Sequence, residues 1–133
     1  MWRTDAFEEF LSRYSPAVKV LAFETRRLIQ RLIPEAIEMV DAPSKIVAYG
    51  HSPKYADLIC AIAPYHTCIN LIFSRGIKLS DPDKLLIGTG KQARHLKIDS
   101  PKLAENAGLE ALIKQASTLI RNEKKGSTLE KEK

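Results

Sequence analysis

The sequence predicts an α+β fold: a two-layer sandwich in which an antiparallel sheet of about five strands carries the N- and C-terminal helices on one face. Apolar residues recur at helical spacing in the N-terminal third and near the C-terminus, whereas strand-like patterns fill the middle of the chain. The connections between the expected strands are too short for helical crossovers, so consecutive strands must be antiparallel. This order of elements disfavours a doubly wound parallel sheet.

Two helices are predicted in the N-terminal third. Thr4 is the expected N-cap of a short amphipathic helix that ends near Ser15. Ser15 then caps a second helix with Pro16 at its first position, and Pro34 limits its C-terminal extension. The polar face of this second helix carries most of the basic residues of the region: Lys19, Arg26, Arg27 and Arg31.

Four strands are predicted in the middle third, each bounded by Pro, Gly, Ser or Asp: Ile37–Asp41, Ile46–Gly50, Tyr55–Ala63 and Thr67–Phe73. A tight turn at residues 64–66 would pair Ala63 with Thr67 and Ile62 with Cys68. Both faces of the last two strands are largely apolar, so the second face of the sheet is not expected to be open to water. A pocket, a dimer contact or a covering segment is expected there.

A long connection and a fifth strand follow. Residues 74–92 are rich in turn formers, and a connection of this length in so small a domain is typical of a functional loop. Residues 94–98 alternate as a strand, with His95 and Lys97 on one face. A final helix is predicted up to about Arg121, which gives a single domain over residues 1–121 and a flexible charged tail over residues 122–133.

Composition excludes several classes of protein. The chain has 133 residues, 44% of them hydrophobic, and a mean hydropathy of −0.20, which excludes disordered and membrane-embedded proteins. The acidic N-terminal segment lacks the pattern of a signal peptide, so a cytoplasmic location without a membrane partner is expected. Two cysteines give no disulfide framework. A net charge of +5 permits acidic partners.

The most specific patterns lie in the second half of the chain: Phe73–Gly76, Leu79–Asp83, Leu85–Lys91 and Arg94–Ile98. Similar patterns continue at Leu32–Glu35, Tyr49–Gly50, Pro53, Tyr55 and the helix around residues 112–116. Over roughly residues 7–120 the chain resembles the YdhG-like family of small uncharacterised bacterial domains. The resemblance implies a two-layer sandwich related in shape to frataxin-like folds, and some members carry an iron-chaperone label by similarity to frataxin.

Iron or metal handling is therefore an alternative function, but the residues favour another role. Hard iron ions prefer clustered carboxylate oxygens, whereas the corresponding region offers only scattered acidic residues: Asp5, Glu8, Glu9 and Glu24. A net positive charge also opposes cation capture. The three histidines lack the spacing of a zinc site, and Cys60 and Cys68 do not form a CxxC motif. No metal site and no cofactor are predicted.

The best candidate site combines two glycines with cationic or titratable side chains: Gly88, Gly90, Lys91, Arg94, His95 and Lys97. Glycines let the backbone approach a ligand closely and expose N–H donors, while the cations neutralise an anion. The run is not a Walker loop, which has glycine in place of Leu85 and Ser or Thr in place of Gln92. Alternatively, the glycines only form a turn into the fifth strand and the lysines are solvated.

A second candidate is the rim of a pocket for a small polar or aromatic ligand, formed by Tyr49, His51 and Tyr55 together with Tyr65 and His66. These residues equally suit a structural role at the edge of the core. No nucleophile elbow or triad is present, so no catalytic residue is predicted, and a small enzyme using this pocket remains an alternative.

The basic residues of the second helix lack a recognised nucleic-acid-binding module, so specific nucleic-acid binding is not expected. The leading hypothesis is a non-catalytic module that binds an anionic small molecule or an acidic partner at residues 88–97. A homodimer through the second face of the sheet is also allowed.

Overall fold

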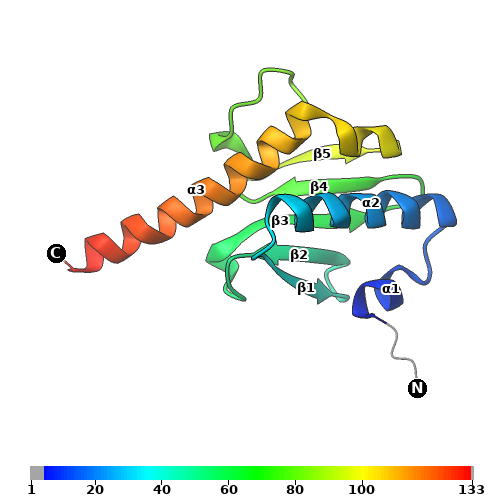
Figure 1. Cartoon of the computed structure of the whole chain (residues 1–133), viewed down its shortest axis with the longest axis horizontal. Helices are drawn as coiled ribbons and strands as arrows, with labels where there is room; N and C mark the ends of the chain where they lie inside the picture. Colours follow the sequence, from blue (N-terminus) through cyan, green and yellow to red (C-terminus); the bar gives the residue numbers. More distant parts are fainter. Residues whose placement is uncertain (1–4, 133) are drawn as a thin grey trace.

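The computed structural model describes residues 5–132, with side chains for residues 5–123, and confirms the α+β prediction (Figure 1). Its helices and strands are α1 (Ala6–Leu11), α2 (Pro16–Leu32), β1 (Ile37–Asp41), β2 (Ile46–Gly50), β3 (Leu58–Pro64), β4 (Ile69–Phe73), β5 (Arg94–Ile98) and α3 (Ala107–Glu132). The strands form one antiparallel sheet in sequential order, β1-β2-β3-β4-β5. Figure 1 shows α2 and α3 crossing the same face of this sheet. No helix in the described part of the chain is long and apolar enough to cross a membrane.

The N-terminal helices begin at side-chain caps. An Asp5 carboxylate oxygen accepts a hydrogen bond of 2.8 Å from the Phe7 N–H, while the predicted cap Thr4 lies outside the described residues. Ser15 caps α2 as predicted, with its hydroxyl oxygen 3.2 Å from the Val18 nitrogen. Because the cap before Pro16 takes an extended backbone, α1 cannot run into α2, and it ends at Leu11 rather than near Ser15.

The β3–β4 hairpin corrects the predicted strand register. Ala63 pairs with Asn70, not with Thr67, and the Tyr65 N–H donates to the Cys68 carbonyl oxygen at 2.8 Å across a four-residue turn. This longer turn places Leu71 opposite Ile62, and both are fully buried. A shift of the pairing by one residue would turn the buried side chains of one strand to the opposite face of the sheet. Burial of these side chains, rather than the shortest turn, therefore sets the register.

Side-chain alternation along the strands gives the sheet two faces. The face against α2 and α3, called the helix face, carries the bulky core residues Val47, Tyr49, Cys60, Ile62, Leu71, Phe73, Leu96 and Ile98. The opposite face, called the far face, carries two rows that cross all five strands. Row one is Met39, Ala48, Ala61, Ile72 and His95; row two is Asp41, Ile46, Ala63, Asn70 and Lys97.

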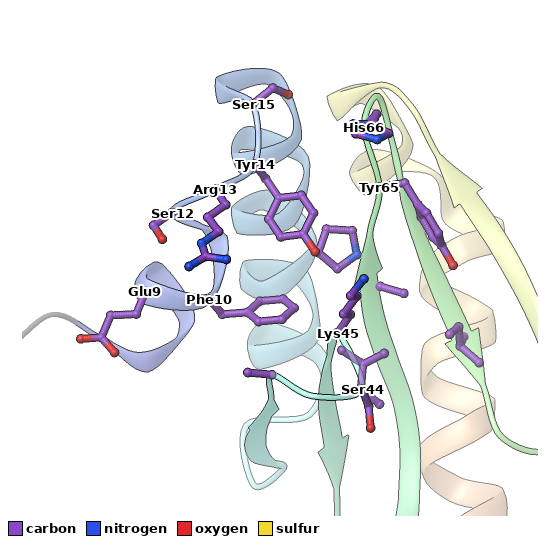
Figure 2. A pocket seen from close by; sticks show the side chains of 15 residues that line it. Glu9, Phe10, Ser12, Arg13, Tyr14, Ser15, Ser44, Lys45, Tyr65 and His66 are labelled. Carbon is purple, nitrogen blue, oxygen red and sulfur yellow. The ribbon is translucent and has the colours of Figure 1, made fainter.

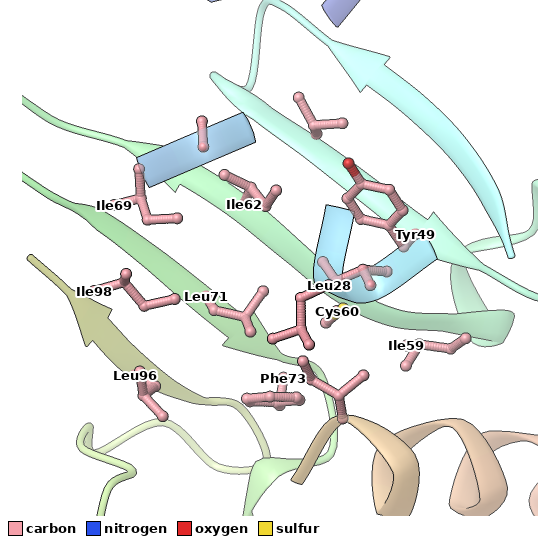
Figure 3. Close-up of a cluster of buried hydrophobic side chains, with 14 of the residues drawn as sticks. Leu28, Tyr49, Ile59, Cys60, Ile62, Ile69, Leu71, Phe73, Leu96 and Ile98 are labelled. Carbon is pink, nitrogen blue, oxygen red and sulfur yellow. The ribbon is translucent and has the colours of Figure 1, made fainter. Parts of the chain in front are cut away.

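The core lies between the helix face and the two long helices. Figure 3 shows the strand side chains of this layer, including Tyr49, Cys60 and Leu71, with Leu28 of α2 directed among them. Cys60 is 2% exposed, and burial raises the pKa of its thiol to about 12. Cys68 is half-buried in the β3–β4 turn, and both thiols are free.

The C-terminal helix is longer than predicted. The Asn106 side-chain oxygen accepts a hydrogen bond of 3.1 Å from the Leu109 N–H, so Asn106 caps α3, and Gly108 lies in the first turn of the helix. The helix continues past Arg121 to Glu132, because Lys and Glu favour helix even where the apolar stripe has ended. The predicted flexible tail covers residues 122–133. Beyond Glu123 its side chains lie outside the described residues, so its flexibility stays a prediction.

Candidate functional site

The glycine-containing connection before β5 is a closed loop. Ile87 and His95 form an isolated antiparallel bridge, in which each backbone N–H donates to the other residue's carbonyl oxygen at 2.8 and 2.9 Å. Gly88 follows the bridge with φ of +128°, a conformation that a residue with a Cβ rarely adopts. The bridge therefore holds residues 88–94 as a loop at the edge of the sheet.

The base of this loop is fixed by a close backbone approach. A Cβ atom built on Gly76 would lie 2.4 Å from the Arg94 Cβ, so no side chain fits at Gly76. The Ile77 N–H also donates to the Gln92 carbonyl oxygen at 3.0 Å. The short 3₁₀ helix Gly76–Lys78 thus contacts both the loop and the first residue of β5.

Arg94 folds back over its own loop. One terminal guanidinium nitrogen donates to the carbonyl oxygens of Gly90 and Ala93 at 2.5 and 2.7 Å. These bonds close the loop from inside, and they use one nitrogen of the guanidinium while the group keeps its positive charge. Arg94 therefore acts first as a positioning residue for the loop backbone.

The structure separates the predicted anion-binding residues into two groups. Gly88, Gly90 and Lys91 lie in the exposed loop. Strand alternation places Arg94 on the helix face but His95 and Lys97 on the far face, where they pair with Ile72 and Asn70. A Cβ on Gly88 would lie 3.5 Å from a His95 ring nitrogen, so the loop and this imidazole are neighbours.

The loop also presents unused backbone donors. Residues 88–91 are exposed, and within the described part of the chain none of their N–H groups donates a hydrogen bond to the protein. Consecutive free N–H groups in a loop with left-handed backbone are a common way to hold an anion. Their position beside Lys91 brings both kinds of anion-binding group into the same segment.

The predicted pocket of Tyr49, His51 and Tyr55 is not formed, because the three side chains lie in different surroundings. Tyr49 is 1% exposed and bonds to Glu38, whereas Tyr55 is 83% exposed. A His51 ring nitrogen lies 3.0 Å from the carbonyl oxygen and 3.3 Å from the hydroxyl of Ser117 in α3. The alternative of a small enzyme built on these three residues loses its geometric basis.

A groove elsewhere includes the other two residues of that prediction (Figure 2). Tyr65 and His66 line an open cavity of about 1330 Å³, together with residues of α1, the α1–α2 connection and the β1–β2 turn. The far-face residues Ile46, Ala63 and Ile72 also line it, so the cavity opens onto the far face of the sheet. Figure 2 shows the rings of Phe10 and Tyr14 and the Lys45 side chain directed toward it. The four-residue spacing of Phe10 and Tyr14 brings these two rings together, 6.0 Å between centroids, whereas Lys45 and the β3–β4 turn are distant in sequence, so the groove itself could not be predicted.

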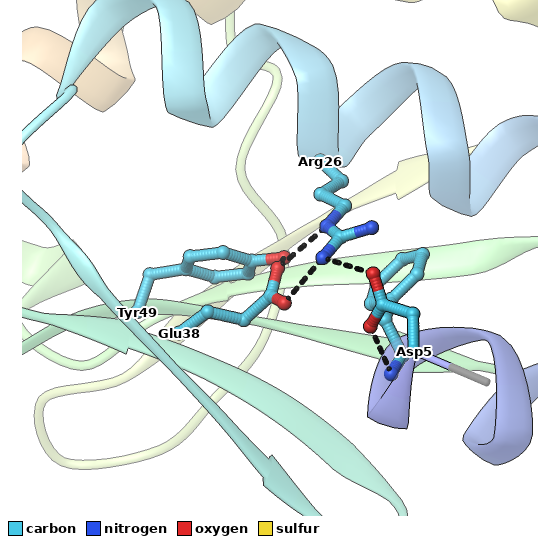
Figure 4. Close-up of polar contacts among 5 residues, drawn as sticks. Asp5, Arg26, Glu38 and Tyr49 are labelled. Atoms are coloured by element: carbon cyan, nitrogen blue, oxygen red, sulfur yellow. Dashed lines mark hydrogen bonds and ion pairs between the residues drawn. The ribbon is translucent and has the colours of Figure 1, made fainter. Parts of the chain in front are cut away.

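The arginines among the basic residues of α2 have structural partners, and Figure 4 shows those of Arg26. Arg26 binds Glu38 through two nitrogens at 2.8 and 2.7 Å, binds Asp5 at 2.9 Å, and lies 4.4 Å above the Phe7 ring centroid. The Tyr49 hydroxyl donates to the same Glu38 carboxylate at 2.7 Å, and burial, followed by this bond, raises the pKa of Tyr49. This cluster joins α1, α2, β1 and β2.

Other arginines of the helices are paired in the same way. Arg31 binds Glu110 of α3 at 2.7 Å, and Arg121 of α3 binds Glu35 at 2.6 Å. Arg27 is 78% exposed and lies 3.8 Å from Glu24 on its own helix. Among the described residues, by contrast, neither Lys91 nor Lys97 has a carboxylate partner.

The acidic residues considered for iron are also distributed. Asp5 caps α1 and binds Arg26, while Glu24 faces Arg27. No group of three or more His, Cys, Asp or Glu side chains in residues 5–123 is arranged to hold a metal ion. Comparison of the chain with protein-family models, curated proteins and solved structures finds no match. The resemblance to the YdhG-like family therefore stays a prediction.

Proposed function

We propose that this protein is a non-catalytic binding module that holds an anionic small molecule, or an acidic segment of a partner, at residues 88–97. The observation that carries the proposal is the contrast in charge pairing. Lys91, which lies beside the unused N–H groups of the loop, lacks a carboxylate partner among the described residues, whereas the arginines of α2 are occupied by ion pairs. An unpaired cation in water can bind an incoming anion without first breaking an internal contact.

The loop supplies two kinds of interaction to such a ligand. The exposed N–H groups of residues 88–91 donate directional hydrogen bonds, and Lys91 adds a mobile positive charge. Phosphate and carboxylate oxygens accept several hydrogen bonds at once, so they fit this set of donors. Arg94 holds the loop in place from below through the Gly90 and Ala93 carbonyl groups.

The proposal extends to family and location. A domain of the YdhG-like type in the cytoplasm would meet phosphorylated and carboxylated metabolites, which are ligands of this chemistry. The α+β sandwich is compatible with that assignment.

Thermal unfolding with inorganic phosphate, or with citrate, tests the proposal against sodium chloride of matched ionic strength. A ligand at about 100 times its Kd stabilises a protein by about 2.7 kcal/mol, which raises Tm by several degrees. We expect this rise for the unmodified protein and its loss in Lys91→Ala. Lys114→Ala is the matched control, because Lys114 is exposed on α3 and distant in sequence from the loop.

Two outcomes would contradict the proposal. One is an equal rise in Tm with sodium chloride, which would indicate general screening of charge. The other is a phosphate or citrate response that Lys91→Ala leaves unchanged, which would place the anion elsewhere on the molecule.

A further inference from the structure

The far face of the sheet is apolar at its centre and carries exposed isoleucines at both edges. Its centre consists of Ala48, Ala61 and Ala63, which are 4–8% exposed. Ile37 of β1 is 39% exposed, and Ile87, which extends row one through its bridge to His95, is 51% exposed. The three alanines are themselves buried, so the apolar surface left in contact with water comes from the half-buried Met39, Ile46 and Ile72 and from the two exposed isoleucines. Apolar surface gathered on one face in this way is typical of an interaction site.

The charged and titratable residues of the far face lie at its two opposite edges. Asp41 ends row two on β1, whereas Lys97 ends the same row on β5, and His95 ends row one there. Four strand spacings of about 4.8 Å separate the edges, or about 19 Å, which exceeds the Debye length of about 8 Å at physiological salt. Asp41 and Lys97 of one molecule therefore cannot neutralise each other.

We propose that a second copy of the chain covers the far face, related by a two-fold axis that runs parallel to the strands beside β3. This rotation places β1 of one copy over β5 of the other. Each row then lies over the same row of the partner, which runs in the opposite direction. Asp41 therefore meets the partner's Lys97, and the symmetry repeats this contact at the other edge. Among the described residues Asp41 accepts only the Ser44 N–H and neither it nor Lys97 has an ion pair, so the dimer gains two.

The same axis matches small side chains with large ones. It places β2 over the partner's β4, so Ala48 lies over Ile72, while the alanines of β3 face each other across the axis. Sheets stack at about 10 Å when their side chains interlock in this way. A two-fold axis across the strands would instead bring Lys97 toward its own copy, so the charge pattern selects the parallel axis.

The size of the face sets the expected affinity. Five strands of about five residues cover roughly 24 Å by 17 Å, or about 400 Å² on each copy, compared with about 800 Å² per partner in a standard interface. The dimer is therefore weak, with a Kd in the micromolar range or above. It depends on protein concentration and, through its ion pairs, on salt.

Charge-reversal variants test both the interface and its axis in sedimentation velocity over a micromolar to millimolar concentration series. Asp41→Lys and Lys97→Asp each place like charges together, so each alone is expected to stay monomeric. An equimolar mixture of the two is expected to associate, as is the double variant. Glu105→Lys and Lys114→Asp change the net charge equally at exposed sites outside the far face and the loop, and are expected to dimerise normally.

Each remaining outcome overturns the proposal. If the unmodified protein is monomeric at millimolar concentration, the dimer is excluded. If both single variants dimerise as the unmodified protein does, the interface lies on another surface. Loss of association in the single variants without rescue in the mixture excludes the parallel axis. Circular dichroism checks that the variants fold. The inference does not depend on anion binding, because Lys91→Ala removes the phosphate response while leaving the association intact.

Discussion

Two groups of cations on this molecule have similar composition but opposite environments. Two arginines of α2 lie against carboxylates from other elements: Arg26 binds Glu38 and Asp5, and Arg31 binds Glu110. In the β5 region, Arg94 binds carbonyl groups of its own loop, and Lys91 and Lys97 have no carboxylate partner in the described part of the chain. The first group holds elements together, while the second is available to a ligand or partner.

The contrast shows that charge content alone does not locate a binding surface. A net charge of +5 and a basic helix face are visible in the sequence, and both draw attention to α2 as much as to the loop. Pairing distinguishes them, because a carboxylate bound to an arginine occupies part of its N–H donors and offsets its charge, which leaves less of both for another anion. Three experiments probe the distinction, in order of expected effect.

The largest effect is expected for Arg26→Met, which removes the guanidinium but keeps an apolar stem. The carboxylate of Glu38 then keeps only the Tyr49 hydroxyl as a partner in a half-buried position. We expect the free energy of unfolding to fall by about 2 kcal/mol, between the values for exposed and buried ion pairs. Urea denaturation measures it.

Arg27→Met is the control on the same helix. Its ion pair with Glu24 is long and largely exposed, so the change should stay within about 0.5 kcal/mol. Lys91→Met should also change the free energy of unfolding by no more than about 0.5 kcal/mol. Equal losses for the three variants would mean that the paired and unpaired cations do not differ as described.

An intermediate effect is expected in the loop itself, where two glycines have different roles. Gly88→Ala places a Cβ on a backbone with φ of +128°, which should cost about 1–2 kcal/mol of stability. Gly90→Ala is the matched variant, because its added Cβ meets only ordinary contacts, and it should cost less than about 1 kcal/mol. Similar values for both, measured by urea denaturation, would contradict the loop conformation.

The smallest effect concerns acid. The backbone hydrogen bond from Phe7, followed by the bond from Arg26, holds the pKa of Asp5 below its ordinary value. A carboxyl group with a lower pKa in the folded state stabilises the protein fully above its unfolded pKa of about 3.9. The contribution is lost as the pH falls through the folded pKa.

Asp5→Asn should therefore flatten the decline in urea midpoint below about pH 4, relative to the unmodified protein. Glu105→Gln alters an exposed carboxylate without an ion pair in the described region and serves as the control. If Asp5→Asn follows the profile of the control, Arg26 gains nothing from Asp5 and belongs with the weakly paired cations.

Much of the fold could be predicted because its signals are local. The Ser15–Pro16 cap, the period-two strands and the short connections between them determine the α+β class and the antiparallel order. The errors lie where tertiary packing overrides local pattern. The β3–β4 turn has four residues because Leu71 must lie opposite Ile62, and the first residues of the predicted third strand form the 3₁₀ helix Tyr55–Asp57.

The candidate site was predictable only in part, for a similar reason. Gly88 could be recognised from sequence because glycine marks a left-handed backbone, and the structure gives it that conformation. The separation of Arg94 from His95 and Lys97 follows from strand alternation alone. The environments of Tyr49, His51 and Tyr55 depend on which helix packs against the end of each strand. The order of residues along the sequence does not give this information.

Of the two cysteines, one can be labelled by thiol-reactive reagents. The thiolate is the reactive form of cysteine, and with a pKa of about 12 only about one Cys60 in ten thousand is ionised at pH 8. Cys60 is also sealed in the core, whereas Cys68 is half-buried in the turn that carries Tyr65 and His66. A maleimide dye or spin label will therefore attach at Cys68, so the native chain reports on the end of the β3–β4 hairpin without an engineered cysteine.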